Sequence, residues 1–275
     1  MDYLPEHIES ARVLMTIKTY PSLSQKYGEL VCTAGVCNGK LVRMYPIQFR
    51  DLSDYQKFKK FQWIEVSLQK RKKDFRPESY TPVREIKLCE HISPEKDGWS
   101  KRMKELSSLT MHDNMRELIN ITKQPPYPSL AMVKPREIID FKIESCSREW
   151  TDAQKAYFQQ PDLFKDIGPL TLRKLPYKYS YRFVTKDEQE RTLMIEDWEI
   201  GALYWNCLND ADGNEDIANQ KVKEKYMAIA GNPNTFFFVG TTLANHVQAP
   251  NPYIIIGVVA PNSSYNPNIV QPDLF

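Results

Sequence analysis

The sequence predicts an α+β protein: a β-rich barrel-like or curled-sheet block, then a helical segment, then a second mixed α/β block. Two observations carry this prediction. Runs of strand length, rich in β-branched and aromatic residues, fill the chain up to about residue 90. From residue 100 to 123 the apolar residues instead fall near one face of a helix.

Five segments of the first block have the composition of strands, namely 11–20, 29–37, 40–49, 62–70 and 83–90. Asn38-Gly39 separates the second segment from the third, and this dipeptide favours a tight hairpin because both residues accept positive φ. Short polar breaks separate the strands, as in a small barrel. We therefore expect an OB-like or similar architecture.

The helix predicted over 100–123 should end at the proline-rich residues 124–128. A strand over 136–145 and a helix over 150–159 are expected next. The second mixed block comprises predicted strands at 178–186, 191–200, 235–243 and 252–260, with a helix over 217–230. We divide the chain into a basic β-rich block (1–98), a mainly helical connecting region (99–175), a mixed α/β block (176–260) and an extended tail (261–275).

Composition is that of an ordinary globular protein, with 41% hydrophobic and 26% charged residues. No apolar run reaches the length of a membrane span, and residues 1–15 lack the pattern of a signal peptide. We therefore expect a cytoplasmic protein with no membrane partner. The five cysteines are scattered and form no CxxC pair, which predicts reduced thiols and no zinc framework.

Charge is unevenly distributed, although the net charge is only +2. Residues 57–87 hold ten Lys/Arg against four Asp/Glu, whereas residues 187–216 hold ten acidic residues and one basic residue. A basic surface of this kind favours contact with a polyanion such as DNA, single-stranded DNA included. The predicted nucleic-acid-binding residues are Lys57, Lys59, Lys60, Lys70, Arg71, Lys72, Lys73, Arg76, Arg43 and Arg50.

Aromatic residues are interleaved with these cations: Phe58, Phe61, Trp63, Phe75 and Tyr80. Two interpretations are open. The rings could stack on bases, as in a single-strand groove, or they could belong to the core beneath a solvated charged loop. For the aromatic residues we favour the core.

The last five residues, Gln271 to Phe275, read QPDLF. This segment resembles the bacterial sliding-clamp-binding motif, Gln-x-Ser/Asp-Leu-Phe, at Gln271, Asp273, Leu274 and Phe275. The resemblance implies the bacterial sliding clamp, the DNA polymerase III β subunit, as a partner. Burial of Leu274 and Phe275 gives roughly 3 to 6 kcal/mol before ordering costs, so the tail alone should bind with about micromolar affinity. The alternative is a tail that folds back into the protein's own core.

The same five letters occur at Gln160 to Phe164, after a predicted helix. We expect Leu163 and Phe164 of this internal copy to be core or domain-packing residues.

Two sets of residues are candidates for metal-dependent nuclease chemistry. Asp197 and Glu199 would share one face of a strand and could bind a divalent cation, whereas at a helix N-terminus they would only complement the helix dipole. Asp74, Glu85 and Lys87 resemble the D…ExK pattern of restriction-endonuclease-like proteins. Mg²⁺ or Mn²⁺ is implied only if one of these sets is active.

Residues 209–217, NDADGNEDI, resemble the start of an EF-hand loop. Glu215 replaces the glycine of the sharp turn, and Lys221 replaces the bidentate glutamate. We therefore interpret this segment as a capped, acidic loop leading into a helix.

The sequence as a whole predicts a bacterial DNA-associated protein that binds nucleic acid and is recruited to the sliding clamp. Its process would be replication, repair, or mobile-element and phage defence. The first alternative is a metal-dependent nuclease recruited in the same way. The second is an interaction protein with a buried tail and no nucleic-acid contact.

Overall fold

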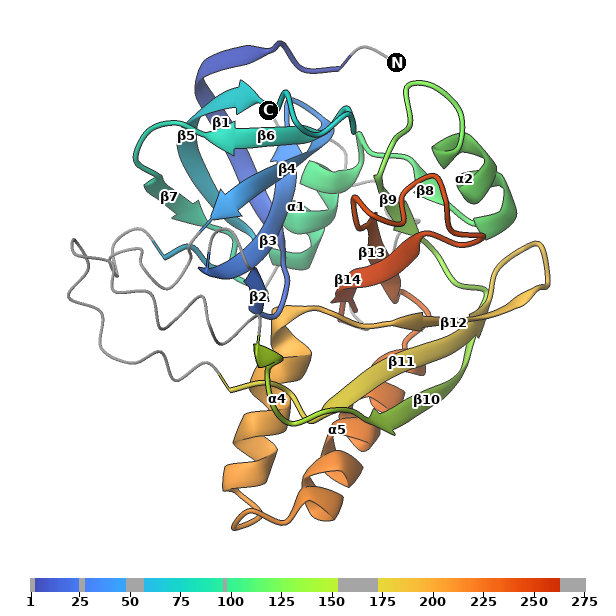
Figure 1. Ribbon diagram of the computed structural model, residues 1–275. Helices are drawn as coiled ribbons and strands as arrows, with labels where there is room; N and C mark the ends of the chain where they lie inside the picture. The colour runs from blue at the N-terminus through green and yellow to red at the C-terminus, as the bar shows by residue number, and fades with distance from the viewer. Residues whose placement is uncertain (1–2, 25–27, 48–56, 96–97, 153–172, 263–275) are drawn as a thin grey trace.

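The computed structural model describes residues 3–24, 28–47, 57–95, 98–152 and 173–262. Within these residues a closed five-stranded barrel is followed by helices and further mixed sheets, which confirms the predicted α+β class. Figure 1 shows the barrel beside a four-stranded sheet, with a three-stranded sheet and two helices beyond them.

The barrel is built from five strands whose bounds are β1 (His7–Lys18), β3 (Gly28–Cys37), β4 (Lys40–Ile47), β5 (Gln62–Lys70) and β6 (Ser79–Pro82). They pair in the order β1-β3-β4-β6-β5, and a β5–β1 pairing closes the ring. All of these pairs are antiparallel except β4–β6. Two outer strands, β2 (Ser22–Ser24) and β7 (Lys87–His91), pair with β3 and β5.

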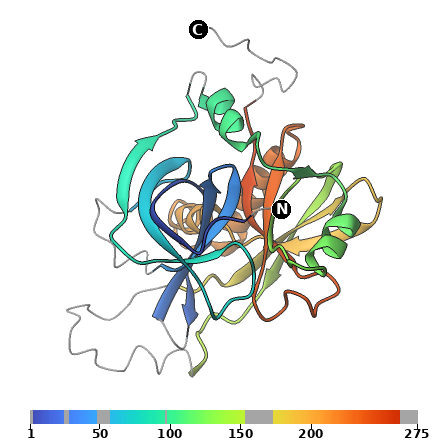
Figure 2. The ribbon, with the colours of Figure 1, turned by 90° about the horizontal axis from the view of Figure 1, so that it is seen from above.

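This connectivity is that of an OB fold, in which the third and fifth barrel strands form the one parallel pair. The view in Figure 2 shows the strands curling around a common centre. The predicted hairpin is confirmed: Asn38 and Gly39 join β3 to β4 with φ of 48° and 72°.

Strand β1 is buried on both of its faces. Val13 and Met15 point into the barrel core, whereas Leu14 and Ile17 contact the next sheet. A bulge between Met15 and Ile17 shifts the register and re-aims the end of the strand. The outer side of the barrel is therefore an apolar packing surface as well as a barrel wall.

The helix predicted over 100–123 is wrong as one continuous element. The structure has two helices, α1 (Gly98–Leu106) and α2 (Met115–Thr122), separated by strand β8 (Met111–His112). Asn114 caps α2 by accepting from the N–H groups of Arg116 and Glu117. Strand β8 pairs in parallel with β9 (Leu130–Val133), so its backbone bonds are made in a sheet instead of a helix.

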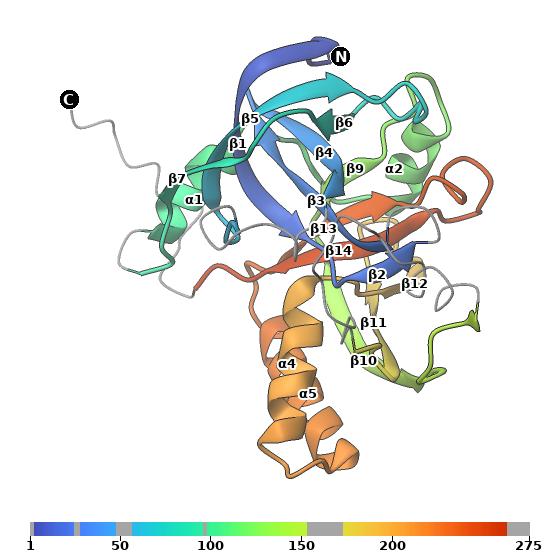
Figure 3. The same ribbon diagram turned by 60° about the vertical axis from the view of Figure 1, so that its left-hand side comes forward.

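The second block contains two sheets and a helical hairpin. A four-stranded sheet has the order β14-β13-β9-β8, where β13 is Phe236–Thr241 and β14 is Tyr253–Val259. A three-stranded sheet comprises β10 (Glu137–Ser145), β11 (Tyr177–Val184) and β12 (Glu190–Met194). Helices α4 (Trp198–Asn209) and α5 (Glu215–Ala230) form the hairpin that extends away from the barrel in Figure 3.

The strand predicted over 191–200 is wrong in its second half. Strand β12 ends at Met194, and α4 begins at Trp198 because Asp197 is its N-cap. The predicted helix over 217–230 is confirmed as α5, whose N-cap is Asn214.

Two apolar clusters hold the second block together and attach it to the barrel. The first packs the three-stranded sheet against α4 and α5, with Tyr179, Tyr181 and Tyr204 fully buried in it. The second joins Leu14 and Ala34 of the barrel to the four-stranded sheet. No helix of the described residues has the length and apolar character needed to cross a membrane.

Gly35 of β3 pairs with Met15 of β1, and a side chain at this position would collide with the β1 backbone. A Cβ at Gly35 would stand 2.3 Å from the Leu14 carbonyl oxygen. We expect Gly35→Ala to lower the free energy of unfolding by about 1 to 3 kcal/mol, measured by chemical denaturation. Gly231→Ala is the matched control, because its Cβ would have no contact shorter than 3.6 Å. An unchanged midpoint for Gly35→Ala would contradict the close β1–β3 approach.

Candidate nucleic-acid interface

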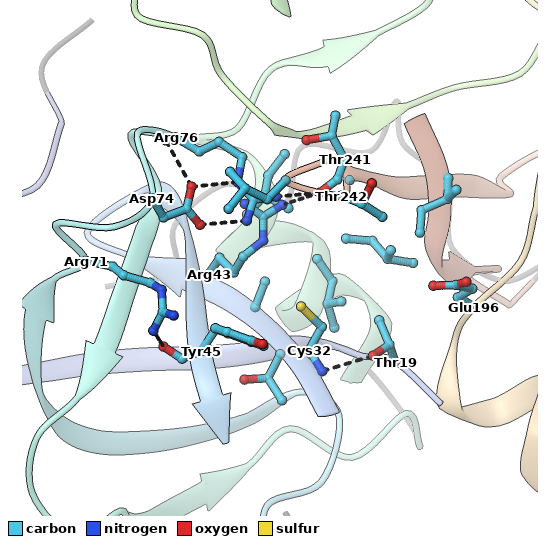
Figure 4. A pocket seen from close by; sticks show the side chains of 18 of the residues that line it. Thr19, Cys32, Arg43, Tyr45, Arg71, Asp74, Arg76, Glu196, Thr241 and Thr242 are labelled. Carbon is cyan, nitrogen blue, oxygen red and sulfur yellow. Dashed lines mark hydrogen bonds and ion pairs between the residues drawn. The ribbon is translucent and has the colours of Figure 1, made fainter. Parts of the chain in front are cut away.

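A cavity of about 390 Å³ lies between the barrel and the four-stranded sheet. Its barrel side is formed by β3, β4 and the loop from Arg71 to Glu78, and its other side by the ends of β13 and β14 (Figure 4). The volume falls within the range of about 300 to 1,000 Å³ that is typical of small-ligand sites. Aliphatic walls and charged groups both face this space.

A buried ion pair between Arg76 and Asp74 lies at one end of the cavity. Arg76 donates to both carboxylate oxygens of Asp74, at 2.8 Å from Nε and 2.6 Å from Nη2, and its Nη1 donates to the Thr241 carbonyl oxygen at 2.6 Å. Burial opposes the ionisation of Asp74, but the hydrogen bonds and charge of Arg76 outweigh it and lower the pKa of Asp74 to about 2. The two side chains therefore stay charged, and their hydrogen bonds fix the conformation of the loop that carries both.

Arg43 of β4 carries a second buried guanidinium group. Its Nη1 donates to the Ser129 hydroxyl at 2.7 Å, and its Nη2 lies 3.4 Å from the Thr241 carbonyl oxygen. Glu78 accepts from the N–H and the hydroxyl of Ser129, at 2.8 and 3.0 Å. Burial lowers the pKa of Arg43. Barrel and second block are thus joined by charge-assisted hydrogen bonds.

The loop between β5 and β6 presents a basic and aromatic rim beside the cavity. Lys72 and Lys73 are exposed, and Phe75 is 55% exposed. The guanidinium carbon of Arg71 lies 4.8 Å from the centre of the Tyr45 ring. The Phe75 ring makes an edge contact with Tyr127, whose ring centre is 6.0 Å away, and a tilted contact with His246 at 5.4 Å.

Strand β5 divides the predicted basic stretch into two parts. Its nine residues span about 30 Å, so the cations before it and those after it lie at opposite ends of the strand. Lys59 is exposed and Lys57 half-buried at the first end. Lys60, also at that end, donates to the Val258 carbonyl oxygen at 3.3 Å.

At the other end, the basic residues differ in their exposure. Lys72 and Lys73 face solvent, and Arg71 is half-buried, whereas Arg43 and Arg76 are buried in the cavity network. Lys70 donates to the Arg76 carbonyl oxygen at 3.0 Å. Arg50 lies outside the described residues.

The aromatic residues were expected to belong to the core, and the expectation is wrong for Phe75. Phe58, Phe61 and Tyr80 are buried, and Trp63 is half-buried. Phe75 points outward because its neighbours Asp74 and Arg76 turn inward to form their ion pair. Phe75, which lies between these two residues, therefore faces solvent.

The D…ExK candidate residues are not assembled into a metal site. Asp74 is bound by Arg76, Glu85 is exposed, and Lys87 is an exposed side chain 3.6 Å from Glu65. Within the described part of the chain there is no group of three His, Cys, Asp or Glu residues that could hold a metal ion.

Asp197 and Glu199 do not lie on a strand, so the geometry that suggested a shared cation is wrong. Asp197 Oδ1 accepts from the Ile200 N–H at 2.9 Å and the Tyr226 hydroxyl at 3.1 Å. Burial, with the charge of Glu199, raises the pKa of Asp197 to about 6. Glu199 instead lies 3.4 Å from Lys60 Nζ. Asp197 is the N-cap of α4 and Glu199 lies in its first turn, so the two acids complement the helix dipole, which was the alternative to a metal site.

The segment 209–217 is a capped loop, as expected from the two positions at which it differs from an EF-hand. It connects α4 to α5, and Asn214 accepts from the N–H groups of Asp216 and Ile217. The internal QPDLF copy (160–164) and the C-terminal copy (271–275) both lie outside the described residues.

Several residues around the cavity carried no recognisable sequence signal. Glu78 and Ser129 are 51 positions apart, and Thr241 is 165 positions from Arg76. A buried polar network drawn from such distant segments becomes visible only when the fold brings them together. The one local hint was the pair Asp74 and Arg76, two residues apart.

We expect Asp74→Asn to cost about 3 to 5 kcal/mol of unfolding free energy at pH 7, because it leaves the Arg76 charge buried without a counter-charge. The control is Glu188→Gln, which removes an exposed pair of similar length, 2.7 Å against 2.6 Å. That change should cost less than about 1 kcal/mol. Equal losses in urea unfolding would contradict the buried pair.

The same pair has a defined pH dependence. The pKa of Asp74 falls from 3.8 to about 2 on folding, so its contribution to stability is complete above pH 3.8 and is lost as pH falls through about 2. The stability difference between the wild type and Asp74→Asn should shrink over that interval.

Comparison with known protein families divides the chain into two matches. Residues 9–108 match a domain of unknown function, DUF8758, and residues 110–274 match a second, DUF8757. The first match covers the barrel and α1, and the second covers the sheets and helices that follow. A search of curated proteins finds no match to this sequence. Because the second match spans more than half of the 275 residues, the chain belongs to the DUF8757 family.

Proposed function

We propose that this protein binds single-stranded nucleic acid along the rim of the interdomain cavity and is recruited to a bacterial sliding clamp by its C-terminal tail. The observation that carries the first part is the loop from Arg71 to Glu78. This loop places two exposed lysines and an exposed phenylalanine beside a cavity on the outer face of an OB barrel.

The location agrees with the way OB folds bind ligands. They use the face of their second and third strands, together with the loops that join the first to the second and the fourth to the fifth strand. The corresponding parts here are β3, β4, the segment between β1 and β3, and the loop between β5 and β6. The cavity is lined from all four of these parts.

The chemistry of the rim suits an unpaired strand. Lys72 and Lys73 can neutralise phosphates, and the exposed ring of Phe75 can stack on a base. Stacking of this kind needs a base that is not inside a duplex, which favours a single strand over double-stranded DNA. The Arg71 guanidinium group, stacked on Tyr45, adds a third cation at the same place.

The clamp part of the proposal rests on the sequence of the tail. Gln271, Asp273, Leu274 and Phe275 match the clamp-binding motif, and Pro272 pre-extends the segment. A weak tail becomes an effective tether when the barrel holds the same DNA, because the second contact is then intramolecular. Replication, repair or defence against mobile elements are the processes in which such a protein would act.

No contact in the described residues favours the nuclease alternative. The Asp74 carboxylate is bound by Arg76, and the Asp197 carboxylate is bound by main-chain N–H groups and Tyr226. We therefore make no catalytic proposal.

The double substitution Lys72→Ala and Lys73→Ala should weaken binding to a labelled single-stranded oligonucleotide. The slope of log affinity against log salt should fall by about 1 for each lysine that contacts a phosphate. Fluorescence anisotropy across a series of salt concentrations measures both quantities.

A control with the same charge change is Lys221→Ala with Lys225→Ala, both exposed on α5. This pair should leave the affinity and the slope unchanged. Equal effects of the two double variants would place the interaction elsewhere, and absence of any salt-dependent binding would overturn the nucleic-acid proposal.

Binding to a purified bacterial sliding clamp should be lost when the chain ends at Val270. Surface plasmon resonance with the full chain and the shortened chain makes the comparison, and thermal melting checks that both are folded. Equal binding would direct attention to the internal copy at 160–164. Absence of clamp binding by the full chain would contradict the tail proposal.

A further inference from the structure

Glu196 occupies the end of the cavity opposite the Arg76–Asp74 pair (Figure 4). It lies between β12 and α4, and both blocks fix its backbone. Its N–H donates to the Ile255 carbonyl oxygen at 2.8 Å, and its own carbonyl oxygen accepts from the Tyr20 N–H at 2.9 Å. The position of this carboxylate is therefore set by the barrel and the sheet together.

The two carboxylates among the lining residues have very different surroundings. Asp74 accepts several hydrogen bonds from Arg76. The Glu196 side chain accepts none from any residue that the structure describes, although it is half-buried. Burial raises the pKa of Glu196, and the charge of Lys178 opposes this only in part. A desolvated carboxylate of this kind is stabilised by a ligand that brings N–H donors to it.

Part of the remaining lining is apolar. Ile17 and Ala34 of the barrel and Leu130 and Ile256 of the sheet, which belong to one packed apolar cluster, also line the cavity. Apolar side chains together with a few placed polar groups are typical of small-ligand sites. The cavity also lies beside the loop on which we place the nucleic-acid strand, so we take a base of that strand as its ligand.

Among the nucleobases, guanine fits an ionised carboxylate best. Its N1–H and N2 amino groups lie side by side and can donate to both oxygens at once. In adenine and cytosine, the amino group on the pairing edge stands beside a ring nitrogen that accepts, and in uracil and thymine the ring N–H lies between two carbonyl groups. We propose that this cavity binds a guanine base, with Glu196 accepting from its Watson–Crick edge.

This inference rests on the proposed function when the base belongs to a bound strand, but the cavity can be tested without a strand. Isothermal titration calorimetry of the full chain with guanosine 5′-monophosphate, inosine 5′-monophosphate and adenosine 5′-monophosphate provides the probe. Inosine lacks only the 2-amino group, so it removes one of the two donors without changing the protein. We expect at least about tenfold tighter binding of the guanine nucleotide than of either competitor.

Glu196→Gln should abolish this preference, because an amide offers only one acceptor and adds a donor that faces the guanine N–H groups. Glu224→Gln, on the exposed side of α5, is the matched control and should retain the preference. Equal affinities for the three nucleotides, or an unchanged preference in Glu196→Gln, would overturn the guanine assignment.

The two proposals fail in different ways. Salt-dependent binding of oligothymidine that does not increase when one thymidine is replaced by deoxyguanosine would leave the strand proposal standing and contradict the guanine site. A guanine preference for free nucleotides without binding of any oligonucleotide would support the cavity and overturn the strand proposal. Loss of folding in Glu196→Gln would leave the inosine comparison to decide.

Discussion

The main-chain oxygen of Thr241 accepts from two buried arginines of the barrel, Arg76 at 2.6 Å and Arg43 at 3.4 Å. This shared acceptor lies at the end of β13, so it fixes the barrel against the four-stranded sheet. Asp74 pairs directly with Arg76, whereas Glu78 accepts from Ser129 and favours the Arg43 charge from a greater distance. Separation of the blocks would leave both arginines and Glu78 without their Thr241 and Ser129 partners, which would cost free energy.

The contact between the two blocks also covers part of the face that OB barrels usually use to bind ligands. Apolar contacts from Leu14 and Ala34 attach part of that side to the sheet, so an open groove is not formed there. The residual space is a cavity lined by Arg71, Asp74 and Arg76 of the loop that also carries the exposed residues Lys72, Lys73 and Phe75. In our proposal the exposed loop residues provide affinity through phosphates and stacking, and the cavity selects one base.

The parts of the structure that could be predicted from sequence are those determined by local residues. The Asn38-Gly39 hairpin and the barrel strands follow from turn chemistry and strand composition. The break between α1 and α2 was missed because apolar spacing continued through the segment, and the cap at Asn114 and the pairing of β8 override it. The outward position of Phe75 follows from an ion pair whose partners the sequence could not place.

The candidate site itself depends on distant segments. Arg43 and Arg76 were predicted to meet a polyanion, and the fold instead buries them against Ser129 and Thr241. No sequence pattern marks Glu196 as a site residue; its place in the cavity, without a hydrogen-bond donor among the described residues, results from the fold. The loop between β5 and β6 is visible in the sequence as a run of Lys and Arg, but which of its residues face solvent is a property of the packed structure.

The central claim, that a single strand lies on the loop between β5 and β6, is tested most directly by ultraviolet cross-linking. A single-stranded oligonucleotide would be irradiated in complex with the full chain, and the attached peptides identified by mass spectrometry. Our account predicts cross-links at Phe75 and Tyr45, the aromatic residues of the rim. Cross-links confined to the α4–α5 hairpin, or none under conditions in which the strand is bound, would contradict it.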